Sequence, residues 1–262
     1  NVMRHQLAVG RKVTICGPKG IAKNVQAKLL AYNWILLEAD EHAVSYEIRE
    51  ISDNQQIDVY ELRATRWELH LINSFQSNIV YDNGIFQAKY TLLDHKVSTV
   101  AYLFQAPEKI KMNMQNCPYP AGAWIQKAKQ RRLEIADNEI DTLTETLEIQ
   151  GLEVPLTTLF SYLQKETGYR LGFIMDHQAN EENHAKIRAL FYEADEVFIE
   201  SYYADNEKYM AFLNHHSTAK ASATVMKQAK VKKAIPIHFS RRYHDEISLK
   251  MIQSEFFEAF AQ

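Results

Sequence analysis

The sequence predicts a protein of the α/β class that forms one large domain over residues 1–262. In the C-terminal third, short apolar strands alternate with helical stretches, at residues 172–176, 180–193, 196–199, 217–230 and 231–237. Before them, residues 34–104 carry β-type runs without a substantial helical pattern, and Asp82-Asn83-Gly84 between two of these runs is a strong hairpin signal. We therefore expect an antiparallel sheet followed by alternating strands and helices.

Composition excludes several classes of protein. The chain has 262 residues, of which 46% are hydrophobic, so it is long and apolar enough to bury a core. Its formal net charge of −3 argues against a generally basic surface, and any RNA binding would need a local patch. Two cysteines are too few for a disulfide framework, and no apolar run approaches the roughly 18 residues of a membrane helix. The sequence predicts a soluble, cytoplasmic protein with no membrane partner.

Residues 11–16 form an expected strand, followed by Gly17-Pro18-Lys19-Gly20 and an apolar-periodic helix over 21–32. A glycine turn between a strand and a helix is typical of phosphate binding, but the Gly-Lys-Ser/Thr ending of a Walker motif is missing. A tight strand-to-helix turn is the better interpretation. Further helices are expected over 156–164 and over 247–260, where an apolar face would carry Ile247, Met251, Phe256 and Phe260.

Two histidines near the C-terminus are placed to meet at one end of a sheet. His216 precedes the expected helix 217–230, for which Ser217 or Thr218 is a suitable N-cap. His238 follows the expected strand 231–237. The carboxyl ends of strands in α/β layers are where ligands bind, so both imidazoles are candidate functional groups.

These two stretches resemble motifs of the metallo-β-lactamase superfamily and, within it, of the ribonuclease Z branch. The first is His216-Ser217-Thr218 before an Ala-rich helix, and the second is His238-Phe239-Ser240-Arg241-Arg242-Tyr243, where Arg241 replaces the family's proline. Together they are fairly specific, whereas a lone histidine at a strand end is more often structural. The resemblance implies a four-layer αββα sandwich and a metal-dependent endoribonuclease that removes the 3′ trailer of precursor tRNA by phosphodiester hydrolysis.

Three more positions match the ribonuclease Z pattern. Asp176 corresponds to the aspartate of the family's G-D-T element, although Met175 and His177 depart from it. His95 corresponds to the histidine of an H-x-V site, and Glu200 to the glutamate of a His-Glu-Ala-Thr element. The role of His177 stays open between a donor to a neighbouring group and an additional metal ligand.

The resemblance also implies roles for the matched residues. His95, Asp176 and His238 would be metal ligands, with the carboxylate bridging two zinc ions. His216 would be the catalytic acid, oriented by Glu200, because an imidazole titrates near neutrality. On the residues alone, His95 can equally be a turn residue, and Glu200 can be a solvated residue at a strand end.

The superfamily's principal ligand motif, H-x-H-x-D-H, occurs nowhere among the ten histidines, and His5 has none of its partners. Either the sequence is an N-terminally incomplete form of the sandwich, or the protein has lost the motif and does something else. We prefer the first interpretation because the other matched residues persist. The resemblance then implies two Zn²⁺ per complete site, and fewer or none in the 262-residue chain, whose endoribonuclease activity is doubtful for that reason.

Residues 105–132 break the strand pattern and resemble the protruding RNA-gripping arm of ribonuclease Z. Basic side chains gather there around Tyr119 and Trp124, a combination that suits a phosphate backbone and stacked bases. The basic candidates are Lys127, Lys129, Arg131 and Arg132. A solvated helix face is the alternative from the residues alone, and the resemblance favours RNA.

The resemblance completes the expected site with phosphate-binding residues and partners. Ser240, Arg242 and Tyr243 would contact phosphates beside the cleaved bond. Precursor tRNA would be the substrate, and the family implies a homodimer. Two alternatives remain, a hydrolase of another phosphodiester with the same fold and a catalytically inactive RNA-binding or dimerisation module.

Overall fold

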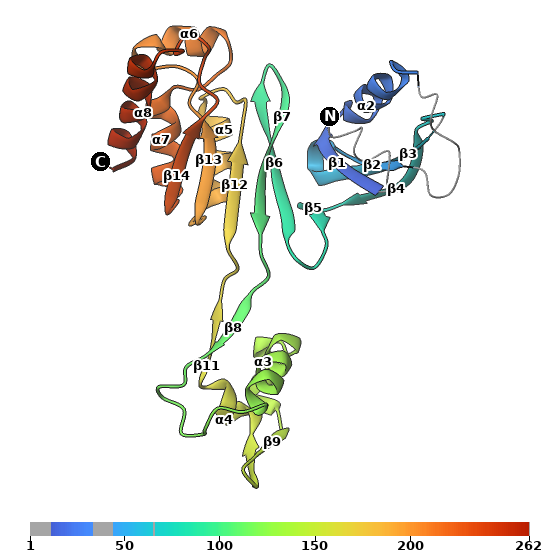
Figure 1. Cartoon of the computed structure of the whole chain (residues 1–262), viewed down its shortest axis with the longest axis vertical. Helices are drawn as coiled ribbons and strands as arrows, with labels where there is room; N and C mark the ends of the chain where they lie inside the picture. The colour runs from blue at the N-terminus through green and yellow to red at the C-terminus, as the bar shows by residue number, and fades with distance from the viewer. Residues whose placement is uncertain (1–11, 34–43, 65, 262) are drawn as a thin grey trace. The chain divides into compact units, whose positions relative to one another are not determined.

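The computed structural model describes residues 12–33, 44–64 and 66–261. The chain divides into two compact units, one formed by Asn1–Gln105 and Arg170–Gln262 and the other by Ala106–Tyr169 (Figure 1). The predicted arm at 105–132 corresponds to the first part of the second unit. His5 and the first β-type run, at 34–39, lie outside the described residues.

The first unit begins with a four-stranded sheet in the order β1-β2-β3-β4. Its strands are β1 (Lys12–Pro18), β2 (Ser45–Ile51), β3 (Gln56–Arg63) and β4 (His70–Gln76). Helix α2 (Ile21–Leu30) follows β1 through Gly20, which adopts a φ of 98° that favours glycine. The Ala22 N–H at the start of α2 donates to the Glu50 carboxylate at 3.2 Å. The strand-to-helix turn predicted from the sequence is therefore confirmed.

A six-stranded sheet follows, in the order β14-β13-β12-β7-β6-β5. Its strands are β5 (Ile79–Asp82), β6 (Gln87–His95), β7 (Val97–Gln105), β12 (Arg170–Ile174), β13 (Glu196–Glu200) and β14 (Lys233–Ile237). Strands β12, β13 and β14 are parallel, whereas β12 pairs antiparallel with β7, placing Arg170 opposite Gln105. The predicted hairpin joins β5 to β6, and the Asn83 side chain accepts from the Ile85 and Phe86 N–H groups.

Alternate residues along each strand supply different layers of the first unit. On β7, Ala101 and Leu103 pack with the helices α5 (Glu181–Phe191), α7 (Ala219–Gln228) and α8 (Glu246–Ala261). Val100, Tyr102 and Phe104 instead pack with residues of the four-stranded sheet. On the other side of that sheet, α2 covers a cluster that contains Ala22, Leu29, Tyr46, Ile48, Leu62 and Trp67. The order helix, sheet, sheet, helices is the predicted αββα arrangement.

Helix α8 confirms the predicted C-terminal helix but not its predicted face. Ile252 and Phe256 are fully buried, with Phe260 packed beside them. Ile247 is 83% exposed and Met251 is also exposed, so their placement in the core was wrong. The buried side chains recur at spacings of three and four, and these two residues fall outside that stripe.

The second unit has its own core and sheets. Strand β8 (Lys109–Met112) pairs with β11 (Leu163–Glu166), and β9 (Thr146–Ile149) pairs with β10 (Leu152–Pro155). Helix α3 (Trp124–Glu134) and helix α4 (Leu156–Phe160) contribute most of its buried side chains. The helix expected over 156–164 ends earlier, because the chain enters β11. Within the described residues, no helix of either unit has the length and apolar character needed to cross a membrane.

Candidate metal and acid-base centre

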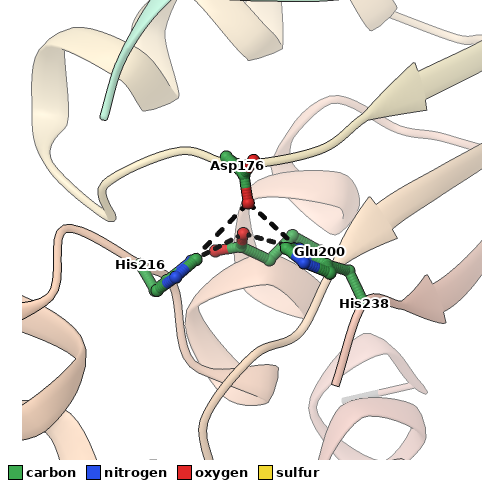
Figure 2. A group of neighbouring side chains, drawn as sticks. All are labelled: Asp176, Glu200, His216 and His238. Carbon is green, nitrogen blue, oxygen red and sulfur yellow. Dashed lines mark hydrogen bonds and ion pairs between the residues drawn. The ribbon is translucent and has the colours of Figure 1, made fainter. Parts of the chain in front are cut away.

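Four side chains from separate segments converge beyond the carboxyl ends of the parallel strands (Figure 2). Asp176 follows β12, Glu200 is the last residue of β13, and His238 follows β14 directly. His216 comes from the loop that leads to α7, whose N-cap is Thr218. One ligand atom from each of the four lies within 4.8 Å of the others. Parallel strands bring these positions to one sheet edge, which the sequence predicted for the two histidines.

Glu200 is fully buried and binds two of these neighbours. Its Oε2 accepts from His216 Nδ1 at 2.9 Å, and its Oε1 accepts from the Ser217 N–H at 2.7 Å. Burial alone would raise the pKa of the Glu200 carboxyl, but hydrogen bonds from His216 and His238 outweigh burial and lower that pKa. The carboxylate therefore stays charged and fixes the proton of His216 on Nδ1, which leaves Nε2 as the reactive nitrogen.

His238 lies between the two carboxylates. Its Nδ1 is 3.2 Å from Asp176 Oδ1 and 3.2 Å from Glu200 Oε2. Its backbone φ is 55°, a left-handed conformation unusual for a residue other than glycine. The hydrogen bond to Glu200 raises the pKa of the His238 imidazole. This strained position after β14 turns the ring back across the strand ends.

His95 lies beside this group of four without joining it. It ends β6, and Lys96 makes the tight turn into β7 with a φ of 64°. His95 Nδ1 donates to the His215 carbonyl at 2.6 Å, and the His95 ring centroid is 4.5 Å from that of His216. A carbonyl oxygen only accepts, so the neutral His95 ring keeps a free lone pair on Nε2. Histidine ligands of metals commonly have their other nitrogen held in this way.

His177 is fully buried beside Asp176 and is absent from the group of four. Its Nδ1 donates to the Met175 carbonyl at 3.1 Å, and among the described residues its Nε2 has no hydrogen-bond partner. Burial lowers the pKa of this imidazole. The ring therefore stays neutral, and its ring centroid lies 6.4 Å from that of His184.

Tyr202 is a site residue that the sequence reasoning missed. Its ring stacks on His216 with centroids 3.8 Å apart and an interplanar angle of 2°, and it meets His238 edge-on at 5.2 Å. The available signal was its position two residues after Glu200, where the family pattern has a threonine. The path of the loop after β13, which decides this contact, is not readable from the sequence.

The expected phosphate-binding residues belong to the C-terminal motif, and each already forms a hydrogen bond or ion pair within the chain. Arg242 and the Tyr243 hydroxyl both bind the Glu207 carboxylate, and that hydroxyl also accepts from the Ala204 N–H at 2.8 Å. Ser240 is buried, and its N–H donates to the Tyr202 carbonyl at 3.0 Å. Contact of Arg242 or Tyr243 with a phosphate would require them to leave or share Glu207.

The basic cluster of α3, defined as Lys127, Lys129, Arg131 and Arg132, divides into two pairs. Arg131 binds Glu134 and Glu145, and Arg132 binds Asp137. Lys127 is exposed, and neither Lys127 nor Lys129 forms an ion pair with a described residue. The two lysines are thus the members of the cluster with free charge.

Trp124, expected to stack on bases, is instead buried in the core of the second unit. Its Nε1–H donates to the Pro120 carbonyl at 2.9 Å, and its ring packs edge-on against Tyr119 at 6.1 Å. An indole used for internal packing is unavailable for a nucleic-acid base, so this expectation was wrong for Trp124.

The donor set of the first unit fits a divalent metal ion. Within the group of four, Asp176 offers a carboxylate oxygen and His238 an imidazole nitrogen, and His95 has a free Nε2 beside them. Nitrogen and oxygen ligands of this kind suit zinc and other first-row metals. A buried, charged carboxylate without a bound cation is expensive unless it is hydrogen-bonded, and Glu200 receives that compensation from two histidines.

Comparison with known sequences finds ribonucleases Z, while no family model matches the chain. The chain is 29% identical to ribonuclease Z of Nitrosopumilus maritimus over 178 residues, covering 68% of this chain and 54% of that relative. It is 22% identical to ribonuclease Z of Deinococcus radiodurans over 260 residues, covering 93% of this chain and 71% of that protein. A third, from Borrelia garinii subsp. bavariensis, is 31% identical over 172 residues, with coverages of 63% and 47%.

Comparison with solved structures finds weaker similarity. The short form of human tRNase Z aligns with a TM-score of 0.46 and 13% identity, covering 88% of this chain and 62% of that one. A metallo-beta-lactamase fold protein from Bacillus subtilis aligns with a TM-score of 0.47 and 9% identity, with coverages of 96% and 61%. The sequence similarities are to ribonucleases Z, and the motifs that converge at the strand ends are those that resemble the ribonuclease Z branch of the metallo-β-lactamase superfamily.

Proposed function

We propose that the protein is a metal-dependent endoribonuclease that removes the 3′ trailer of precursor tRNA. The observation that carries the proposal is the pairing of the buried Glu200 with His216 beside Asp176 and His238. A charged carboxylate that holds an imidazole in one tautomer is an acid-base device, and the adjacent donors suit a metal. The similarity to ribonucleases Z supports RNA as the substrate.

His95, Asp176 and His238 are the proposed zinc ligands. When bound, zinc lowers the pKa of water and offsets the negative charge of a phosphodiester. Each zinc ion takes about four ligands, so these three residues suffice for about one ion per chain. A complete two-zinc site would need further donors. A homodimer, implied by the resemblance, and a cytoplasmic location, expected from composition, stay predictions.

The chain's own residues would handle the proton on the leaving group. Water attacks phosphorus and releases one proton to the solvent as the P–O3′ bond breaks. The doubly protonated His216 ring gives its Nε2 proton to the departing 3′ oxygen and returns to the neutral form that carries its proton on Nδ1. Glu200 keeps Nδ1 protonated throughout and stabilises the positive charge of the doubly protonated ring. Tyr202 restricts the rotation of that ring through its parallel stack.

A hydrolase of a smaller phosphodiester is the second candidate. The observations that favour it are the pairing of Arg131 and Arg132 with carboxylates and the burial of Trp124. Both reduce the surface that the second unit offers to RNA. Among the described residues of the basic cluster, only Lys127 and Lys129 are then free to bind a phosphate backbone.

The test is to incubate the full chain and Zn²⁺ with a precursor tRNA that carries a 3′ trailer and, separately, with bis(p-nitrophenyl) phosphate. Because the chain supplies ligands for about one zinc ion, we expect at most slow release of the trailer, and loss of that activity in Glu200→Gln. His70→Ala is the matched control, because His70 is exposed on β4. Hydrolysis of the small diester alone would favour the second candidate, and no hydrolysis of either compound would favour an inactive module.

A further inference from the structure

A cavity of about 440 Å³ lies next to His216, between helices α5, α6 (Lys208–Leu213) and α7. Its wall includes His184 of α5, Phe212 of α6, and Lys220 and Thr224 of α7. This volume falls in the range of small-ligand sites in proteins. His216 belongs both to this wall and to the group of four, so a molecule in the cavity would adjoin the acid-base centre.

An aromatic ring is available on the α6 side of the cavity. Phe212 is 64% exposed, and Ala211 is the one buried residue among those of α6. A short helix that presents its large apolar side chains to solvent is unusual and marks an interaction site. A nucleic-acid base stacks readily on such a ring without regard to its sequence.

Positive charge is available on the α7 side. Lys220 is the second residue of α7 and forms no ion pair with any described residue, and the N-terminal end of a helix adds partial positive charge. The one carboxylate in the wall belongs to Asp205, and Lys208 pairs with it at 3.1 Å. The net charge facing the cavity is therefore positive, as an anionic phosphate requires.

We propose that this cavity binds the nucleotide that adjoins the cleaved phosphodiester bond, with its base on Phe212 and its phosphate near Lys220. The inference rests on the proposed function, since it assumes that the neighbouring centre acts on RNA. A nucleotide unit explains the combination of one aromatic ring, one free cation and a shared wall with His216. A purely apolar ligand would make no electrostatic interaction with Lys220.

The experiment measures binding of a phosphorothioate RNA trinucleotide, which resists cleavage, to the full chain with Zn²⁺. Phe212→Ala should weaken binding on the order of tenfold, because one base loses its stacking surface. Lys220→Ala should weaken it less and lower the salt dependence by about 0.7 in log–log slope, the loss of one phosphate contact on a single strand. Tyr209→Ala and Lys227→Ala are matched controls from the same helices that do not line the cavity, and both should bind as the unaltered chain does.

Unchanged binding in both Phe212→Ala and Lys220→Ala, with folding verified by thermal melts, would overturn the proposal. Equal losses in Tyr209→Ala would also overturn it, because the whole apolar surface of α6 would then be responsible. Release of the 3′ trailer from precursor tRNA by the unaltered chain tests the proposed function separately. Binding with the expected variant pattern but no hydrolysis would uphold the cavity and reject the enzyme.

Discussion

The strand-end group of the first unit and the basic cluster of α3 differ in how their charges are matched. At the strand ends, Asp176, Glu200, His216 and His238 come from four separate segments and face one another. In the basic cluster, Arg131 and Arg132 turn to carboxylates of their own unit. Sheet topology brings distant residues together predictably, whereas a cluster of like charges in the sequence does not say which opposite charges will surround it.

The largest effect is expected at the strand ends, from His216→Ala. Loss of a general acid should lower turnover on the order of 10²- to 10⁴-fold, while metal content stays unchanged, because His216 is not among the proposed ligands. Turnover and metal content by mass spectrometry are measured on the same preparation, with His70→Ala as the control. Loss of bound zinc in His216→Ala would instead make His216 a ligand.

A smaller effect is expected from Tyr202, which contacts two of the four groups. Tyr202→Leu removes the parallel stack on His216 and should lower kcat by about three- to tenfold, in keeping with an aromatic pair worth about 0.5–1.5 kcal/mol. KM should change little, because the ring orients the acid and does not hold the substrate. Tyr202→Phe keeps the stack and should retain kcat within about twofold. An equal loss in both variants would assign the effect to the hydroxyl.

For the basic cluster, the structure predicts unequal contributions to RNA binding. Replacing Lys127 and Lys129 by Gln should lower the salt dependence of precursor tRNA binding by up to about 1.8 in log–log slope, at roughly 0.9 per contact with a duplex. Replacing Arg131 and Arg132 by Gln should change the slope less, since both already bind carboxylates. Equal slopes for both double variants would remove this distinction.

The smallest effect concerns stability in acid. Burial lowers the pKa of His184 to about 4, against a value near 6.5 when the chain is unfolded. Between these two values the imidazole of the unfolded chain binds a proton, whereas that of the folded chain does not. The contribution of His184 to the free energy of unfolding is therefore largest above pH 6.5 and falls as the pH drops toward 4. Urea midpoints across this range should decline less steeply in His184→Gln. An identical decline would assign it to other groups, of which His177, also buried and of lowered pKa, is the first to examine.

The αββα layers were implied by the family resemblance, whereas the placement of Asp176, Glu200 and His238 at strand ends follows from periodicity in the sequence. Tyr202 escaped prediction because its contact depends on an irregular loop. The ion-pair partners of Arg131 and Arg132 were not predicted, because Glu145 and Asp137 follow the predicted arm at 105–132 in the sequence. Ile247 was misplaced because the first turn of a helix satisfies an apolar pattern without facing the core.

The second unit leaves and rejoins the six-stranded sheet at residues that face each other across one ladder, Gln105 and Arg170. Two chain ends in that position need only a short turn to be joined. The second unit, Ala106–Tyr169, could therefore be replaced by another segment without altering any part of the chain that supplies the strand-end group. The sequence of the second unit can therefore change in evolution while the strand-end group stays unaltered.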